Sequence, residues 1–148
     1  MRLPTMPVPV RVPVSRLPAA GVAGLLILGV ACAAPGSAKE PPVYVLNLYG
    51  AEEGRSDQKP GDLTVSEFST LNGVTWQSWG PTRAAGSGEL TGSWCLPQCM
   101  DTPYTATVTL SNVAAVKGKG YFTKYEITAQ LPQDQRDKAD LTGTLPTP

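Results

Sequence analysis

The sequence contains no histidine, and this absence removes several classes of catalytic site. Ser-His-Asp and Cys-His nucleophile systems use an imidazole as the general base, so neither can be built from this chain. The ordinary proton shuttle near neutral pH is lost for the same reason. Metal sites that depend on imidazole ligands are excluded as well.

Acidic residues are absent before Glu40, whereas Arg2, Arg11 and Arg16 lie in the first sixteen residues. The whole chain has 12 basic and 12 acidic residues and a formal net charge of zero. Without residues 1–31, nine basic residues face twelve acidic ones, which gives a net charge of −3. A mildly acidic body has no long-range attraction for nucleic acid or anionic lipid. We therefore expect no nucleic-acid partner, and contact with a membrane only through the N-terminal segment.

The N-terminal segment has the pattern of an export signal. An uncharged stretch follows the basic residues, and its densely apolar part runs over 19–34. This part is shorter than the roughly 20 apolar residues that a membrane-spanning helix needs, and it is followed by small residues as signal cleavage requires. We predict a signal helix and linker over 1–38, with Met1 or Met6 as the true start. The alternative is a retained N-terminal anchor helix.

Cys32 has two predicted fates. The sequence Leu-Gly-Val-Ala-Cys over 28–32 resembles a bacterial lipoprotein box, in which the cysteine becomes the lipidated first residue of the mature chain. Ala31 suits the position before the cysteine, but Gly29 replaces the usual leucine. The competing cut lies near 38/39, after Ala38, and would discard Cys32. The first reading predicts a lipid-anchored protein at the outer face of the cytoplasmic membrane, and the second predicts a secreted protein.

Cysteine is scarce, with only three copies, and an odd count is unusual for an exported protein. The count becomes even once Cys32 is lipidated or removed, which leaves Cys95 and Cys99 as a pair around Pro97. In an oxidising compartment this pair is expected to form a disulfide. A redox pair is the alternative, but such motifs have two residues between the cysteines rather than three. Two cysteines without histidine make a poor zinc site, so no cofactor or metal is expected.

Long helices are excluded by 15 proline and 15 glycine residues, and the remaining pattern is that of short strands between turns. The expected strands are 43–49, 63–68, 74–79, 83–90, 105–110 and 121–129, with tight turns at 72–73 and 117–120. We predict an all-β fold, a small antiparallel sandwich or barrel-like meander of about six or seven short strands. The single β domain is expected over 39–131, and the charged and then Thr/Pro-rich residues 132–148 are expected to be a flexible tail.

One stretch of the chain resembles a known group of proteins. Its elements are Trp-Gln-Ser-Trp-Gly at 76–80, Ala-Gly-Ser-Gly at 85–88, Cys-Leu-Pro-Gln-Cys at 95–99, and the strand 106–110. In order and spacing, residues 60–130 resemble uncharacterised small exported proteins of high-GC Gram-positive bacteria. Met100 and Asp101 depart from the small residue and glycine expected after the second cysteine. The resemblance implies export and a compact β domain, and it implies no activity.

Paired carboxylates are the remaining route to catalysis, because glycoside hydrolysis needs only two of them at a defined separation. Glu67, Glu89, Asp101 and Glu126 lie in or beside the expected sheet. The simpler interpretation is that they are solvated surface charges. A calcium site would need acidic oxygens clustered in one loop, and Glu52, Glu53 and Asp57 are the only such group.

Tryptophan supplies the best binding candidates by residue type. Trp76 and Trp79 are three residues apart, so a regular strand would place them on opposite faces. One of them, with Tyr104 or Tyr121, could form an aromatic platform for a sugar or peptide. The alternative is that both pack, one of them against the disulfide turn. Glycines at 86 and 88 are expected to admit a neighbouring backbone or a large aromatic ring.

These observations favour a non-enzymatic binding or interaction module at the cell exterior. Its partner would be a glycan or protein of the cell envelope. The alternatives are a structural or accessory envelope protein without a ligand, and a small carboxylate-dependent hydrolase.

Overall fold

The computed structural model describes residues 40–148, which lie in one compact unit. The predicted signal helix, Cys32 and both cleavage sites lie outside the described residues. The described elements are β1 (Val43–Asn47), β2 (Arg55–Asp57), β3 (Leu63–Thr64), β4 (Ser69–Trp79), β5 (Arg83–Gly92), a 3₁₀ turn (Ser93–Cys95), α1 (Gln98–Asp101), β6 (Tyr104–Val116), β7 (Lys119–Ala129), α2 (Gln133–Arg136) and β8 (Thr142–Thr144).

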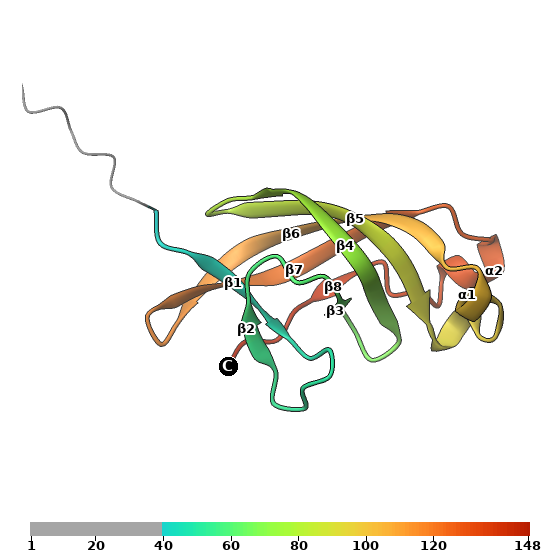
Figure 1. Ribbon diagram of the computed structural model, residues 1–148, viewed down its shortest axis with the longest axis horizontal. Helices are drawn as coiled ribbons and strands as arrows, with labels where there is room; N and C mark the ends of the chain where they lie inside the picture. The colour runs from blue at the N-terminus through green and yellow to red at the C-terminus, as the bar shows by residue number, and fades with distance from the viewer. Residues whose placement is uncertain (1–39) are drawn as a thin grey trace, which may run out of the picture. The chain divides into compact units, whose positions relative to one another are not determined.

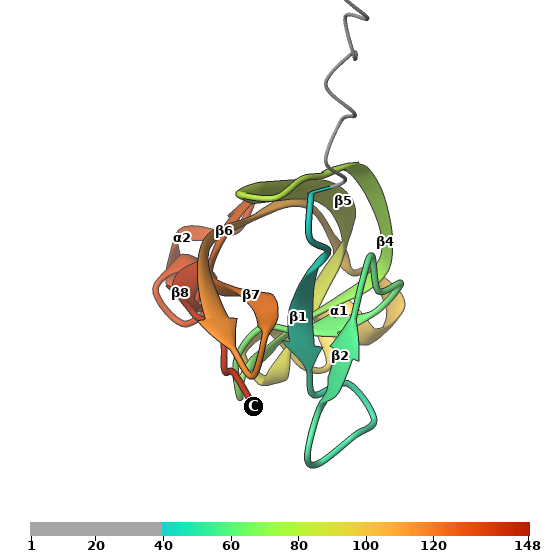
Figure 2. The same ribbon diagram turned by 90° about the vertical axis from the view of Figure 1, so that its left-hand side faces the viewer.

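The eight strands of the described region form one curled sheet in the order β2-β1-β7-β6-β5-β4-β3, and β8 adds to β7 off this path. Strands β3 to β7 form an antiparallel meander, whereas β1 pairs with β7 in parallel. Figure 2 shows that the sheet curls round, so that β1 lies between β7 and β4 in this view. The all-β, barrel-like prediction is confirmed, and the parallel pair is an addition that turn signals could not reveal.

The β6–β7 hairpin follows directly from its sequence. Lys117 and Gly118 connect the two strands, and both have positive φ, 49° and 79°. A two-residue turn with two positive φ angles matches the twist of paired strands, and glycine adopts such an angle without strain. The turn predicted at 117–120 is therefore confirmed, and the long strands on either side support the rest of the sheet.

Strand β4 corrects the prediction of a tight turn at 72–73. The strand runs through Asn72 and Gly73, and its register with β5 shifts between Asn72 and Thr75. Gly73 has a φ of 57°, so the Asn-Gly pair forms a bulge inside one long strand rather than a hairpin. Both structures need a positive φ at glycine, which is why local sequence cannot separate them.

The core lies inside the curl of the sheet. Leu71, Leu90, Val108, Leu110 and Phe122 each have less than 2% of their surface exposed. Phe122 shares this core with Tyr125, although a regular strand would place residues three apart on opposite faces. The face of β7 that points into the core therefore changes around Thr123, which donates its hydroxyl to the carbonyl of Asn112 at 2.8 Å. Asn112 has a φ of 52°, and this kink lies where the interior face changes.

The C-terminal segment corrects the prediction of a flexible tail over 132–148. Strand β8 pairs with β7 through Tyr125 and Gly143, and Ala139 and Leu145 are 0% and 5% exposed. Strand β1 pairs with β7 only at its beginning, at Val43 and Tyr44, so the rest of that β7 edge is open to the tail. The charged and Pro-rich composition suggested disorder, but a free strand edge in the tertiary structure orders the segment.

Candidate functional site

Trp76 and Trp79 lie on the same side of β4, which corrects the expectation of opposite faces. Their rings are in edge-to-face contact, with centroids 4.7 Å apart and planes at 89°. The register of β4 shifts between Trp76 and Ser78, and this extra residue turns Trp79 to the side of Trp76. Both indoles pack against the core, and the Trp79 ring also meets Phe122 edge-on at 5.4 Å.

The two indoles join the ends of the curled sheet. The Trp79 indole N–H donates to the carbonyl of Val43 in β1 at 2.9 Å, and the Trp76 N–H donates to the carbonyl of Pro60 at 2.8 Å. The Trp79 bond links β4 to β1, with which β4 forms no ladder, and the Trp76 bond links β4 to the loop between β2 and β3. A Cβ on Gly86 would come within 2.9 Å of the Trp76 ring, which confirms that the β5 glycines admit a large aromatic. The tryptophans therefore close the barrel.

Tyr121 and Tyr104 lie elsewhere and do not join a platform with the tryptophans. Tyr121 is 3% exposed, and its hydroxyl is 2.7 Å from the hydroxyl of Ser56 in β2. Tyr104 stacks on Trp94 with ring centroids 5.9 Å apart and donates its hydroxyl to Gln135 in α2 at 2.7 Å. The four residues predicted as an aromatic platform thus occupy three separate places, and each makes internal contacts.

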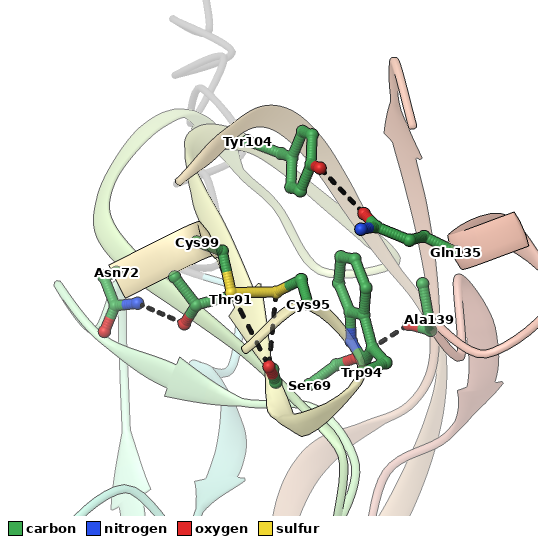
Figure 3. The surroundings of a disulfide bond; sticks show 10 residues. Ser69, Asn72, Thr91, Trp94, Cys95, Cys99, Tyr104, Gln135 and Ala139 are labelled. Atoms are coloured by element: carbon green, nitrogen blue, oxygen red, sulfur yellow. Dashed lines mark hydrogen bonds between the residues drawn. A yellow bond between two sulfur atoms is a disulfide. The ribbon is translucent and has the colours of Figure 1, made fainter. Parts of the chain in front are cut away.

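The predicted disulfide joins Cys95 and Cys99 with an S–S distance of 2.03 Å. Both cysteines are 1% exposed, and their sulfurs lie 3.2 and 3.6 Å from the carbonyl oxygen of Gly92 (Figure 3). Disulfide sulfurs carry no proton, so these are packing contacts rather than hydrogen bonds. The disulfide holds the 3₁₀ turn and α1 as one compact loop over the end of β5.

A small hydrogen-bond network ties this loop to the tail. The Trp94 N–H donates to the Ser69 hydroxyl at 3.0 Å, and that hydroxyl donates to the carbonyl of Ala139 at 2.6 Å (Figure 3). Ser69 is 1% exposed, so these bonds are shielded from water. The tryptophan beside the disulfide turn is therefore Trp94, the residue before Cys95, rather than Trp76 or Trp79.

A groove of about 500 Å³ lies between the disulfide loop and the outer face of the sheet. Its sheet wall carries polar residues that alternate with the core leucines of β4 and β5, namely Asn72, Glu89 and Thr91. Its other wall is apolar and consists of Leu96, Cys99, Met100 and Pro103. The volume is within the roughly 300–1,000 Å³ that ligand pockets occupy.

Two apolar side chains of this groove remain open to solvent. Leu96 is 53% exposed and Met100 is 73% exposed. Phe68, 51% exposed, lies near the same end of the sheet, because its carbonyl accepts the N–H of Ser93 at 3.2 Å. Single exposed apolar residues are ordinary, whereas contiguous apolar patches are typical of interaction surfaces, so this groove is the candidate binding surface. Sequence reasoning missed this surface, because the exposure of Leu96 and Met100 depends on how the disulfide loop packs against the sheet.

The carboxylates considered for catalysis are spread over the surface of the domain. Glu89 lines the groove at the disulfide loop, Glu67 lines a hollow beside β3 and β8, and Glu126 lines a third over β7 and β8. Asp101 is exposed at the end of α1. Glycoside hydrolysis needs two carboxyl groups facing one bond, about 5–10 Å apart. Glu67, Glu89 and Glu126 line three different hollows rather than one.

A second, polar hollow surrounds the loop after β1, where a calcium site was considered. Asn47 donates its amide to Asp57 at 3.0 Å and to the carbonyl of Asp62 at 2.8 Å. Asp57 also forms an ion pair with Arg55 at 3.5 Å. Within residues 40–148, no three His, Cys, Asp or Glu side chains are grouped to hold a metal ion. The polar groups of this hollow bind one another and fix the loop.

Comparisons with protein-family models, curated proteins and solved structures found no match to this chain. Among the helices of residues 40–148, none has the length and apolar character that crossing a membrane requires. The functional argument therefore depends on the geometry of the groove itself.

Proposed function

We propose that the chain is exported and that its β domain is a non-enzymatic binding module outside the cytoplasm, with the groove at the disulfide loop as its contact surface. The observation that carries the proposal is the exposure of Leu96 and Met100 on a loop fixed by a buried disulfide. A ligand that covers these side chains gains apolar burial of about 25 cal/mol per Å². Because the loop backbone is already fixed, less ordering entropy is lost on binding.

The lining favours an apolar segment of another protein as the ligand rather than a glycan. Sugar platforms use flat aromatic faces, and no aromatic side chain lines this groove. The three tryptophans donate their indole N–H groups to acceptors within the domain, so these N–H groups are not free to bind a sugar. Leu96, Met100 and Pro103 instead offer an aliphatic and thioether surface that adapts to apolar side chains.

Export is supported by the disulfide, since such bonds persist in oxidising compartments. The signal segment predicted over 1–38 would supply the route, either with a lipid on Cys32 or with release after Ala38. Mass spectrometry of the mature N-terminus distinguishes the two. A chain that begins at a diacylated Cys32 is tethered, one that begins at Lys39 is secreted, and an unprocessed chain found in the cytoplasm would contradict export.

The binding function is tested with the exported chain by calorimetry and NMR shift mapping. The probes are the peptide acetyl-Ala-Leu-Gln-Leu-Ala-amide and an N-acetylglucosamine oligomer. We expect the peptide to bind with shifts confined to the groove, and the double variant Leu96→Ser/Met100→Ser to weaken it at least tenfold. Val113→Ser is the matched control, because Val113 is 40% exposed on β6 and does not line the groove.

Three results would contradict the proposal. Binding of the sugar alone would indicate a glycan site. Equal losses in the double variant and in Val113→Ser would show that the groove is not the contact surface. An absence of binding by either probe would favour the structural or accessory role.

A further inference from the structure

Glu89 places a carboxylate without an ionic partner at the rim of the apolar groove. It is exposed on the outer face of β5, between the half-buried Gly88 and the fully buried Leu90 of the same strand. The residues directly opposite it are Asn72 on β4 and Thr105 on β6, and neither is charged. Arg55–Asp57 is the one ion pair within residues 40–148, so no basic side chain of this region pairs with the Glu89 carboxylate.

The polar neighbours of Glu89 add acceptors rather than positive charge. The Asn72 amide nitrogen donates to the Thr91 hydroxyl at 3.0 Å, and Figure 3 shows the Asn72 oxygen turned to the other side. Residues 40–148 carry eight basic and twelve acidic side chains, a net charge of −4. The sheet wall of the groove is therefore electronegative, and it faces the apolar wall formed by Leu96 and Met100.

A second copy of the chain fits this surface poorly. A two-fold interface centred on the groove would bring the same patch of both copies together. The two Glu89 carboxylates would then approach each other, and like charges that meet across an interface are unfavourable. The charge pattern instead complements a ligand that carries an apolar side chain next to a cation.

We infer that the groove selects a peptide segment with an apolar side chain beside a lysine or arginine, the apolar group contacting Leu96 and Met100 and the cation pairing with Glu89. This inference rests on the proposed binding function and specifies its ligand class. The apolar contact supplies most of the affinity, and the ion pair supplies the preference. An exposed ion pair contributes about 0.2–1 kcal/mol, which corresponds to a preference of roughly 1.4- to 5-fold in Kd.

The experiment compares three capped peptides that differ at one position, acetyl-Ala-Leu-X-Leu-Ala-amide with X as Lys, Gln or Glu, on the exported chain at low salt. We expect affinity to fall in the order Lys, Gln, Glu, and the preference to shrink in 0.5 M NaCl because salt screens exposed charges. In Glu89→Gln the three peptides should bind alike, at the affinity of the Gln peptide for the native chain. Glu67→Gln is the matched control, since Glu67 lines a different hollow.

The outcomes separate this inference from the proposed function. If all three peptides bind equally and Leu96→Ser/Met100→Ser weakens them, the groove binds apolar segments and the cation preference is wrong. A preference that survives in Glu89→Gln, or disappears in Glu67→Gln, also overturns the inference. If none of the peptides binds, both proposals fall. Concentration-dependent dimerisation that Met100→Ser abolishes would replace the peptide with a second copy.

Discussion

The two ends of the barrel differ in their large apolar side chains, which pack on the core at one end and are exposed to solvent at the other. Toward the end where β1 begins, Trp76 and Trp79 pack inside the curl and donate their N–H groups to Pro60 and Val43 carbonyls. At the end that carries α1 and α2, Leu96 and Met100 stay exposed beside a buried disulfide (Figure 1). Residue type alone suggests binding at the tryptophans.

The difference indicates that internal contacts occupy the tryptophans, whereas the proposed binding surface consists of apolar side chains that remain exposed. When the polar group of a side chain is hydrogen-bonded internally and its ring packs on the core, little contact surface and no free donor remain for a ligand. The apolar surface of an exposed side chain on a fixed loop is not buried in the fold, so all of it can be buried when a partner binds. Substitutions should therefore reduce stability at the first end and reduce binding at the second.

The largest expected effect is at Trp79. Trp79→Ala removes ring contacts with Trp76 and Phe122 and the bond that joins β4 to β1, so the free energy of unfolding should fall by about 3 kcal/mol. Urea denaturation followed by circular dichroism measures this loss. Trp79→Phe keeps a ring and should lose only about 1 kcal/mol with the hydrogen bond. A loss below 1 kcal/mol in Trp79→Ala would mean that the indole does not close the barrel.

The disulfide is expected to affect both properties. Cys95→Ala/Cys99→Ala opens a short loop, and the entropy of closing such a loop corresponds to about 2 kcal/mol of stability. The same variant should bind the apolar peptides more weakly, because the loop that presents Leu96 and Met100 is no longer fixed. Thermal unfolding and calorimetry measure the two effects, and the reduced native chain is the matched comparison. Full binding in the variant would show that the loop is held by packing alone.

Tyr125 provides a smaller effect that is confined to alkaline pH. Burial raises the pKa of its hydroxyl above the ordinary value of about 10, and the Asp140 carboxylate raises that pKa further. Above pH 10 the unfolded chain releases this proton while the folded chain keeps it, so stability falls from about pH 10 until the folded pKa is reached. Below pH 10 both states hold the proton, and the contribution does not vary.

Tyr125→Phe should therefore resemble the native chain at pH 7 and lose less stability between pH 9 and pH 11. Urea midpoints at each pH measure the difference. Tyr49→Phe is the control, because Tyr49 is 40% exposed. A Tyr125→Phe curve parallel to that of the native chain would contradict the buried, proton-retaining environment of this hydroxyl.

Met100, in the proposed binding groove, is where we expect a substitution to have the smallest effect on stability and the largest effect on binding. Met100→Ser should change the free energy of unfolding by no more than about 0.5 kcal/mol, because Met100 is 73% exposed. Leu90→Ala, at a fully buried leucine of β5, should cost about 2–5 kcal/mol in the same assay. A large loss in Met100→Ser would mean that this side chain supports the fold and is not reserved for a ligand.

Local patterns predicted the elements that local physics controls. The alternating residues in the first half of β6 and the Lys-Gly turn between β6 and β7 follow from strand pleating and from the φ angles that glycine permits. The Cys95–Cys99 pair followed from spacing and count. The bulges of β4 could not be predicted, because one extra residue reverses every later side chain without a distinct sequence signal.

The sequence by itself determined an all-β chain, the strands of the main meander, the disulfide and the absence of imidazole chemistry. Each of these depends on residue type or on spacing of a few positions. Tertiary structure alone decided that β1 pairs in parallel with β7, that the tail docks on the remaining β7 edge, and that the tryptophans lie inside while Met100 lies outside. Those outcomes depend on which distant strand edge and which core volume remain unfilled once the sheet has curled.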